Sequence, residues 1–258
     1  MLPGDIEAFM RELCDAAARE TLPRFRMRLA VDNKLESGFD PVTEADRAAE
    51  KAIRALIGER YPDHGILGEE EAATNPDAEY CWHIDPVDGT RAFICGLPSW
   101  GTLIGLTRNG VPVAGLMHQP YTDELFIADG AGSFHCRRQS RTRLSTSPVA
   151  ALAQAKLMTT TPALFAGDDL ARYRRLEEQV RLARYGFDCY AYAMLAAGHV
   201  DLVVECDLKS YDIAPLIPLI EQAGGVVTTW EGACAVDGGR IVAAANGAIH
   251  ARALEVLA

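Results

Sequence analysis

Long apolar stretches and a leader-like start are both missing from this chain of 258 residues. No uninterrupted apolar run approaches the roughly 20 residues that a membrane-spanning helix needs. Residues 1–7 are acidic and lack a basic segment followed by an apolar core, so we expect no secretory signal. We therefore expect a cytoplasmic protein that has no membrane partner.

Positive charge and paired cysteines are also scarce. The chain has 25 Lys and Arg against 36 Asp and Glu, a net charge of -11, whereas a nucleic-acid surface needs clustered positive charge. The 7 cysteines are odd in number and form no C-x-x-C pair, which favours reduced thiols over disulfides or structural zinc. This composition excludes a nucleic-acid partner and fits an enzyme that acts on a small molecule.

Helical and strand-like periodicities alternate along the chain and predict an α/β protein. Chains of this length often remain one cooperative unit, so we expect a single domain over 1–258 with two lobes, about 1–143 and about 144–258. Helices are predicted over 5–25, 44–57, from 90 onward, 168–182, 190–198 and 248–257. Strands are predicted over 65–67, 81–84, 102–106, 113–117, 125–127, 133–135, 156–158, 200–205 and 225–229.

Hard oxygen ligands are concentrated around a glycine turn in the segment 84–90, which reads IDPVDGT. An apolar strand would deliver Asp85 to a sheet edge, where we expect Pro86 to stop the ladder. Asp85 and Asp88 can then face one cation around the bend, with the Val87 carbonyl between them. Oxygen sets of this kind suit magnesium. The segment therefore predicts a metal site.

The end of the same segment predicts a place for an anion beside that metal. Gly89 and Thr90 open an expected helix, whose first N–H groups lack helical acceptors and can bind phosphate. The same residues are also compatible with ordinary turn chemistry, with Asx bonds, a proline and a glycine. A second acidic group, residues 69–71, follows an apolar strand; its carboxylates repel unless they are solvated or neutralised by a cation.

Taken together, these motifs resemble the inositol monophosphatase family of magnesium-dependent, lithium-sensitive phosphomonoesterases, over nearly the whole chain. The family's upstream element appears at residues 40–46 (DPVTEAD), and its C-terminal signature appears at 211–215 (YDIAP), followed by 221–225 (EQAGG). The resemblance implies a layered α-β-α-β-α sandwich with mixed sheets, and a homodimer. Two departures stand out: Tyr211 replaces the usual tryptophan, and Glu71 replaces a frequent serine.

The resemblance also implies roles for particular residues. It implies that the metal ligands, for two or three Mg²⁺ ions, are Glu69, Asp85, the Val87 carbonyl, Asp88 and Asp212. Asp46 and Thr90 would orient the attacking water, and Glu69 would bind the metal that carries it, so that metal-activated water attacks directly without a phosphoenzyme. A different explanation of Asp46 is a capping box with Thr43 at the start of the second helix.

The organic part of the substrate is left open by the family as a whole. The segment 186–189 (GFDC) and Arg91 resemble the histidinol-phosphatase branch, although Phe187 replaces an expected glycine. Asp188 and Glu205 would favour a cationic substrate such as histidinol phosphate; alternatively, Asp188 caps a helix and Glu205 ends a strand in solvent. The candidate substrate-binding residues are Asp88, Gly89, Thr90, Arg91, Asp188 and Glu205.

The sequence therefore predicts a magnesium-dependent phosphatase for a small phosphorylated metabolite. We expect it to hydrolyse histidinol phosphate to histidinol and phosphate, a step of histidine biosynthesis. The alternatives are an inositol-1-monophosphatase, a phosphoadenosine-phosphate phosphatase and, in another class, a non-catalytic sensor of metal or phosphometabolite.

Overall fold

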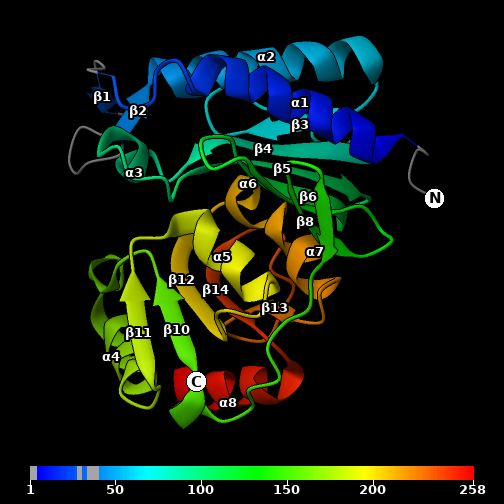
Figure 1. Cartoon of the computed structure of the whole chain (residues 1–258). Coiled ribbons are helices and arrows are strands. Elements are labelled where there is room, and N and C mark those ends of the chain that lie inside the picture. Colours follow the sequence, from blue (N-terminus) through cyan, green and yellow to red (C-terminus); the bar gives the residue numbers. More distant parts are fainter. Residues whose placement is uncertain (1–4, 28–30, 34–40) are drawn as a thin grey trace.

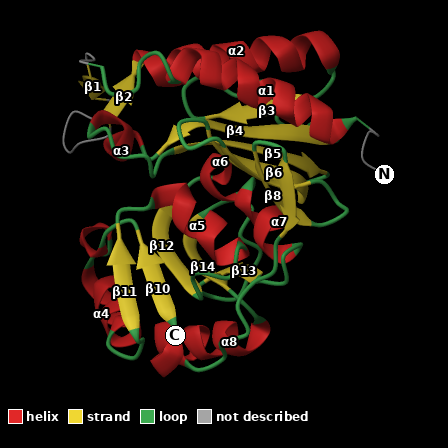
Figure 2. Ribbon diagram, viewed as in Figure 1, coloured by secondary structure: helices red, strands yellow, loops and turns green. Residues whose placement is uncertain are grey.

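The computed structural model describes residues 5–27, 31–33 and 41–258, and two β-sheets with three sets of helices organise them (Figures 1 and 2). From top to bottom in Figure 1, the layers are helices, sheet, helices, sheet and helices. This is the α-β-α-β-α arrangement with mixed sheets that the sequence predicts. No helix of the described residues is long and apolar enough to cross a membrane.

The first sheet has seven strands in the order in which they occur in the chain, from β3 to β9. β3 is parallel to β4, and all later neighbours are antiparallel. The strands are β3 (Gly65–Gly68), β4 (Tyr80–Asp88), β5 (Gly101–Arg108), β6 (Val111–Gln119), β7 (Glu124–Ala128), β8 (Ser133–Arg137) and β9 (Ser140–Arg143). A short antiparallel pair, β1 (Val31–Asn33) and β2 (Pro41–Thr43), stands apart from this sheet.

Helices α1 (Ile6–Thr21) and α2 (Glu44–Arg60) cover the outer face of the first sheet. Their apolar stripes, spaced at three and four residues, contribute Phe9, Leu13 and Ile53 to a core shared with Trp82 and Ile104 of the sheet. One face of each helix is therefore fixed against the strands, and the start of α2 is held near the end of β4.

The second sheet has five strands in the order β11-β10-β12-β14-β13. β10 is parallel to β11 and β12, whereas β14 is antiparallel to β12 and β13. The strands are β10 (Lys156–Thr159), β11 (Leu182–Tyr185), β12 (Leu202–Leu208), β13 (Val226–Thr229) and β14 (Gly239–Ala244). Helices α4 (Gly167–Glu177) and α8 (Gly247–Leu257) cover its outer face, and short 3₁₀ turns lie at Leu152–Gln154 and Pro162–Leu164.

Between the two sheets lie α5 (Asp188–Ala196), α6 (Ser210–Ile213) and α7 (Leu216–Glu221). Their core joins Leu103 and Met117 of the first sheet to Val203 and Ala243 of the second. The remaining helix, α3 (Thr90–Ile94), follows β4 directly. Each sheet comes from one continuous part of the chain, and the expected single two-lobed domain stays a prediction.

A pair of glycines brings the middle helices against the first sheet. Gly105 and Gly115 face each other across β5 and β6, and Pro215, between α6 and α7, lies on them. A Cβ on Gly115 would be 1.9 Å from the Pro215 carbonyl oxygen, and one on Gly105 would be 2.8 Å from its Cα. Only glycine permits this approach, which fixes the end of α6 against the sheet and therefore where Asp212 lies.

Several predicted elements differ from the structure. Strand β4 does not stop at Pro86 but runs to Asp88 through a register shift opposite β5, where Thr102 Oγ1 donates to the Pro86 carbonyl at 2.9 Å. Helix α1 ends at Thr21 rather than at residue 25. Helix α4 ends at Glu177, residues 178–181 form a turn, and Leu182, the last residue of the predicted helix, begins the edge strand β11.

Candidate active site

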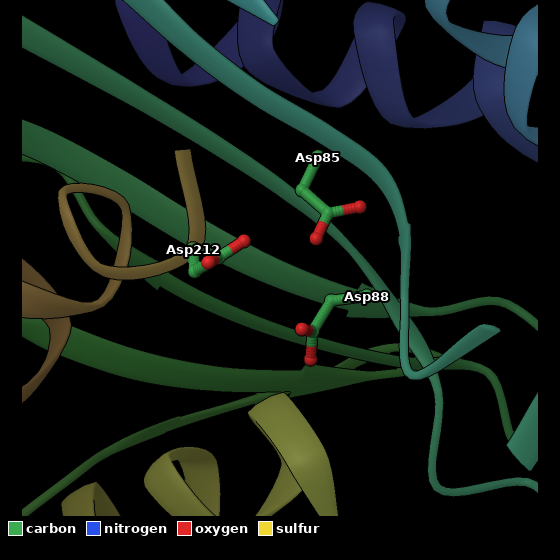
Figure 3. Close-up of side chains that lie close together, drawn as sticks. All are labelled: Asp85, Asp88 and Asp212. Atoms are coloured by element: carbon green, nitrogen blue, oxygen red, sulfur yellow. The ribbon is translucent and has the colours of Figure 1, made fainter. Parts of the chain in front are cut away.

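Three aspartates from two distant parts of the chain meet where the middle helices face the first sheet. Asp85 and Asp88 come from the end of β4, and Asp212 comes from α6 (Figure 3). Each offers a carboxylate oxygen, and these oxygens lie within 4.8 Å of one another. The structure thus brings the predicted acids of two separate motifs into one cluster.

Backbone N–H groups hold each of these carboxylates in place. Val87 N–H donates to Asp85 Oδ1 at 3.0 Å, so the irregular turn of β4 is stabilised by the side chain that it presents. Cys189 N–H of α5 donates to Asp88 Oδ2 at 2.5 Å. Lys209 N–H donates to Asp212 Oδ2 at 2.7 Å. The backbone of three elements therefore orients the carboxylates of the cluster.

The cluster is electrostatically unfavourable on its own. Burial, followed by the charges of Glu69, Asp88 and Asp212, raises the pKa of Asp85 well above its usual range. Burial also raises the pKa of Asp212 to about 7. Buried carboxylates that repel one another are stabilised when a cation binds between them, and an all-oxygen donor set suits a hard divalent ion. The residues present therefore fit a metal of this kind.

Glu69 and Val87 complete the neighbourhood of the cluster. Glu69 follows β3, its N–H donates to the Ile84 carbonyl at 3.2 Å, and its side chain shares a hydrogen bond with Asp85. The Val87 carbonyl accepts from Thr90 Oγ1 at 3.1 Å. The structure thus places all five predicted ligands in one region, whereas their role in ligation stays a prediction.

Asp46 closes the capping box that the sequence offered as one explanation, whereas its role in orienting water stays a prediction. It is fully buried at the start of α2, and its Oδ2 accepts from Thr43 N at 2.9 Å and Thr43 Oγ1 at 2.5 Å, which completes the capping box. Its Oδ1 lies 3.4 Å from Thr90 Oγ1. The cap therefore fixes the carboxylate so that its second oxygen faces the hydroxyl of Thr90.

Asp188 and Glu205 lie in a pocket that continues from the cluster and is also lined by Asp88 and Asp212. Glu205 on β12 is 2% exposed and accepts from Thr160 N at 2.6 Å and Thr159 Oγ1 at 3.2 Å. Burial raises the pKa of Glu205 to about 8. The expectation that Glu205 could end a strand in solvent is wrong.

Asp188 does not cap α5, so that alternative is also wrong. The residue before the helix is Phe187, which makes no side-chain cap bond, and Asp188 is the first helical residue with a φ of 43°. Gly89 has a φ of 84°, which favours glycine, and a Cβ there would crowd Asp188 Oδ2 at 3.1 Å. Burial raises the pKa of Asp188 to about 6, while a Thr160 hydrogen bond and the charge of Arg91 oppose the shift.

Glu50 is a supporting residue that the sequence reasoning missed. It is fully buried on α2, where it accepts from Glu70 N at 2.8 Å, Glu71 N at 3.1 Å and Arg54 Nε at 2.8 Å. It therefore holds the turn that begins at Glu69. The available signal was its position, because an acid on the apolar stripe of a helix needs a partner.

The protein is a layered α/β sandwich with carboxylates grouped between its sheets. This class of protein is suited to metal-dependent phosphate chemistry. The profile of the inositol monophosphatase family matches residues 4–258, and the chain belongs to this family. It is a phosphatase, a phosphoric monoester hydrolase of that family.

Curated relatives and a solved structure are similar over most of the chain. The chain is 39% identical to the bifunctional phosphatase IMPL2, chloroplastic, of Arabidopsis thaliana, over 95% of this chain and 72% of that protein. It is 36% identical to the histidinol-phosphatase of Mycobacterium tuberculosis, over 92% of both. It is also 36% identical to an inositol monophosphatase structure from Zymomonas mobilis, with a TM-score of 0.87 over 99% of both chains.

Proposed function

We propose that this protein is a magnesium-dependent phosphatase that hydrolyses histidinol phosphate in histidine biosynthesis. The observation that carries the proposal is the pocket in which Asp188 and Glu205 lie beside Asp88 and Asp212. A metal-bound phosphate and a cationic organic group would therefore lie next to each other in this pocket. Histidinol phosphate has both, since it carries an ammonium group and a titratable imidazole.

The metal belongs to the carboxylate cluster. Its proposed ligands are Glu69, Asp85, the Val87 carbonyl, Asp88 and Asp212, which would hold two or three Mg²⁺ ions. Bound magnesium supplies charge neutralisation at the phosphoryl oxygens and lowers the pKa of a water molecule, so that a nucleophile forms near neutral pH. The three clustered aspartates support this role because their oxygens lie within 4.8 Å of one another.

Thr90 and Asp46 orient the attacking water in this proposal. The water donates a hydrogen bond to Thr90 Oγ1, and the hydroxyl turns its single proton from the Val87 carbonyl, at 3.1 Å, to Asp46 Oδ1, at 3.4 Å. Asp46 keeps its orientation because its other oxygen accepts two bonds from Thr43. The backbone N–H groups at the start of α3, from Gly89 onward, bind the phosphate.

Charge favours histidinol phosphate over an inositol phosphate. Similarity alone does not choose, because the histidinol-phosphatase and the inositol monophosphatase structure are each 36% identical to the chain. A neutral polyol gains little from two buried acids, whereas an ammonium or imidazolium group offsets the cost of ionising Asp188 and Glu205. An inositol-1-monophosphatase remains the second candidate, favoured by the similarity to the structure from Zymomonas mobilis.

Phosphate release from a panel of esters tests the proposal. The panel contains histidinol phosphate, inositol 1-phosphate and phosphoadenosine phosphate, each with magnesium or with EDTA. We expect the highest kcat/KM for histidinol phosphate and no release in EDTA. A preference for inositol 1-phosphate would establish the second candidate, and a lack of release from all three would favour a non-catalytic sensor.

Two variants test the role of the acidic pocket. We expect Asp188→Asn and Glu205→Gln each to raise KM for histidinol phosphate by roughly 10-fold, as loss of a charge-assisted hydrogen bond implies. The KM for inositol 1-phosphate should change much less. Glu178→Gln, on the exposed end of α4, is the matched control. Equal effects on both substrates would contradict recognition of a cation.

Location and assembly stay predictions. We expect a cytoplasmic protein and a homodimer, and the mass in solution from light scattering tests the second expectation.

A further inference from the structure

The hydroxyl of Tyr192 has no assigned role, and the Tyr192 side chain lines the site pocket. The side chain comes from α5 and is 3% exposed, and its ring belongs to the core between the sheets with Met117 and Leu195. The residue also lines the pocket formed by Asp88, Glu205 and Asp212. The core therefore fixes the ring, and the ring fixes where the hydroxyl lies.

This hydroxyl is buried without a hydrogen-bond partner among the residues that the structure describes. Other phenols are paired: the buried Tyr173 donates to Glu177 at 3.0 Å, and the half-buried Tyr190, two residues before Tyr192, donates to Glu124 at 2.7 Å. Buried polar groups without partners are rare in folded proteins because their loss of hydration is not offset. An unpaired hydroxyl in a pocket therefore indicates a ligand atom that pairs with it.

The charges around the hydroxyl indicate which kind of ligand atom can pair with it. Burial raises the pKa of Tyr192 well above its usual range, and the nearby charges of Glu205, Asp88 and Asp212 act in the same direction. The hydroxyl thus keeps its proton and is a donor in a pocket whose other side chains are mainly acceptors. Its partner must be an acceptor, such as an oxygen atom of a phosphate ester.

We propose that Tyr192 donates a hydrogen bond to the oxygen that joins phosphorus to the organic part of the substrate. This assignment rests on the proposed function, in which phosphate lies at Asp88 and Asp212 and the organic part lies at Glu205. Tyr192 lines the same pocket as Asp88, Asp212 and Glu205, and the bridging oxygen is the substrate atom that joins the two parts of the ester.

A donor at this position assists departure of the leaving group. As the oxygen of water bonds to phosphorus, the bond between phosphorus and the bridging oxygen breaks, and its electron pair stays on the bridging oxygen. One proton of the water ends on that oxygen, which gives the alcohol, and Tyr192 keeps its own proton. The hydrogen bond strengthens as charge develops on the oxygen, so it stabilises the transition state more than the bound ester.

Tyr192→Phe tests this role because it removes only the hydroxyl. We expect kcat for the best alkyl phosphate ester of the panel to fall by about 100-fold, as for loss of one donor to a developing oxyanion. With p-nitrophenyl phosphate, whose leaving oxygen stabilises its own charge, we expect a fall of less than about 5-fold. The Tm should not fall, because the hydroxyl has no partner to lose among the described residues.

Tyr173→Phe is the matched control, since it removes a buried hydroxyl that is bonded to Glu177 on α4. It should lower the Tm and leave the ratio of alkyl to aryl ester turnover unchanged. An unchanged kcat in Tyr192→Phe, or an equal loss with both esters, would overturn the assignment. If the wild-type protein released phosphate from neither ester, the proposed phosphatase activity would fail, and this role with it.

Discussion

The hydroxyl of Thr90 connects the buried Asp46 to the end of β4. Thr90 Oγ1 lies 3.4 Å from Asp46 Oδ1 and 3.1 Å from the Val87 carbonyl. We expect Thr90→Val, which keeps the shape but removes the hydroxyl, to lower kcat by about 100-fold, within the range for loss of general acid-base assistance. Steady-state kinetics at saturating magnesium measures this effect.

Thr90→Ser supplies the control, because it keeps the hydroxyl and should retain kcat within about 5-fold. The rise in Tm on adding magnesium should persist in both variants, since neither removes a carboxylate. Near-normal turnover in Thr90→Val would contradict a role for this residue in orienting water.

The hydrogen bonds of the Glu50 side chain support both the fold and the site. Its buried carboxylate accepts from two backbone N–H groups of the turn after Glu69 and from Arg54. Glu50→Gln turns an N–H₂ group toward these donors, so we expect a loss of about 2 kcal/mol of unfolding free energy. Denaturant unfolding measures the loss.

The half-exposed pair of Glu20 and Arg24 provides the comparison for Glu50. Glu20→Gln should cost less than about 1 kcal/mol, as is usual for an exposed ion pair. Magnesium affinity should fall in Glu50→Gln alone, because the turn carries Glu69. An unchanged affinity would mean that Glu50 supports the fold without positioning the site.

Individual site residues were predictable from the sequence where their neighbours in the chain determine them. Asp85 and Asp88 face the same region because they flank one turn, and the capping box follows from the spacing of Thr43 and Asp46. Asp212 was placed only through the family resemblance, since its position depends on contacts of α6 with a distant sheet. Tyr192 gave no local signal stronger than that of a core residue, and the signal of Glu50 was its place as an acid on the apolar stripe of a helix.

At the scale of elements, the contact of Pro215 with two glycines decides how α6 approaches the first sheet. A Cβ on Gly115 would lie 1.9 Å from the Pro215 carbonyl oxygen, so Gly115→Ala must displace the start of α7 or the strand. We expect a loss of about 1–3 kcal/mol, as for overpacked cores, and a clear loss of activity as Asp212 moves. Denaturant unfolding and steady-state kinetics measure the two effects.

Gly58→Ala is the matched control for this prediction. Gly58 lies in α2, and a Cβ there would meet nothing within 4 Å. Alanine should stabilise the helix by about 0.5–1 kcal/mol without changing kcat. If Gly115→Ala were equally harmless, the glycine contact would not determine the position of α6.

The elements that the sequence missed lack a pattern of alternating burial. β9 is exposed throughout and rich in arginine, and β11 is an edge strand whose residues continue the polarity of the helix before it. β14 ends in small alanines that occur in helices and strands alike. β4 continues past Pro86 because side chains of Asp85 and Thr102 replace the missing ladder bonds. Tertiary contacts, rather than local propensity, decide these segments.

At the scale of the whole molecule, the acids between the two sheets make stability depend on pH. Burial raises the pKa of Glu205 to about 8 and that of Asp212 to about 7. A carboxyl group with a raised folded-state pKa contributes its full stability below its unfolded pKa, near 4, and loses it as pH rises through the folded value. The metal-free protein should therefore lose stability between about pH 4 and pH 8.

Magnesium should reverse this loss, and most strongly at alkaline pH, because protons compete with the metal for the same oxygens. At a concentration 100 times its Kd, a ligand adds about 2.7 kcal/mol, which raises the Tm of a chain of this size by roughly 5–10 °C. We expect this rise at pH 8 and a smaller one at pH 5.5, measured against EDTA. Asp212→Asn should be more stable than wild type in EDTA at pH 8, since it removes a repelling charge, and should show little response to magnesium. A magnesium-induced rise in Tm of equal size at both pH values, or one that persists in Asp212→Asn, would show that the metal does not bind at the clustered aspartates.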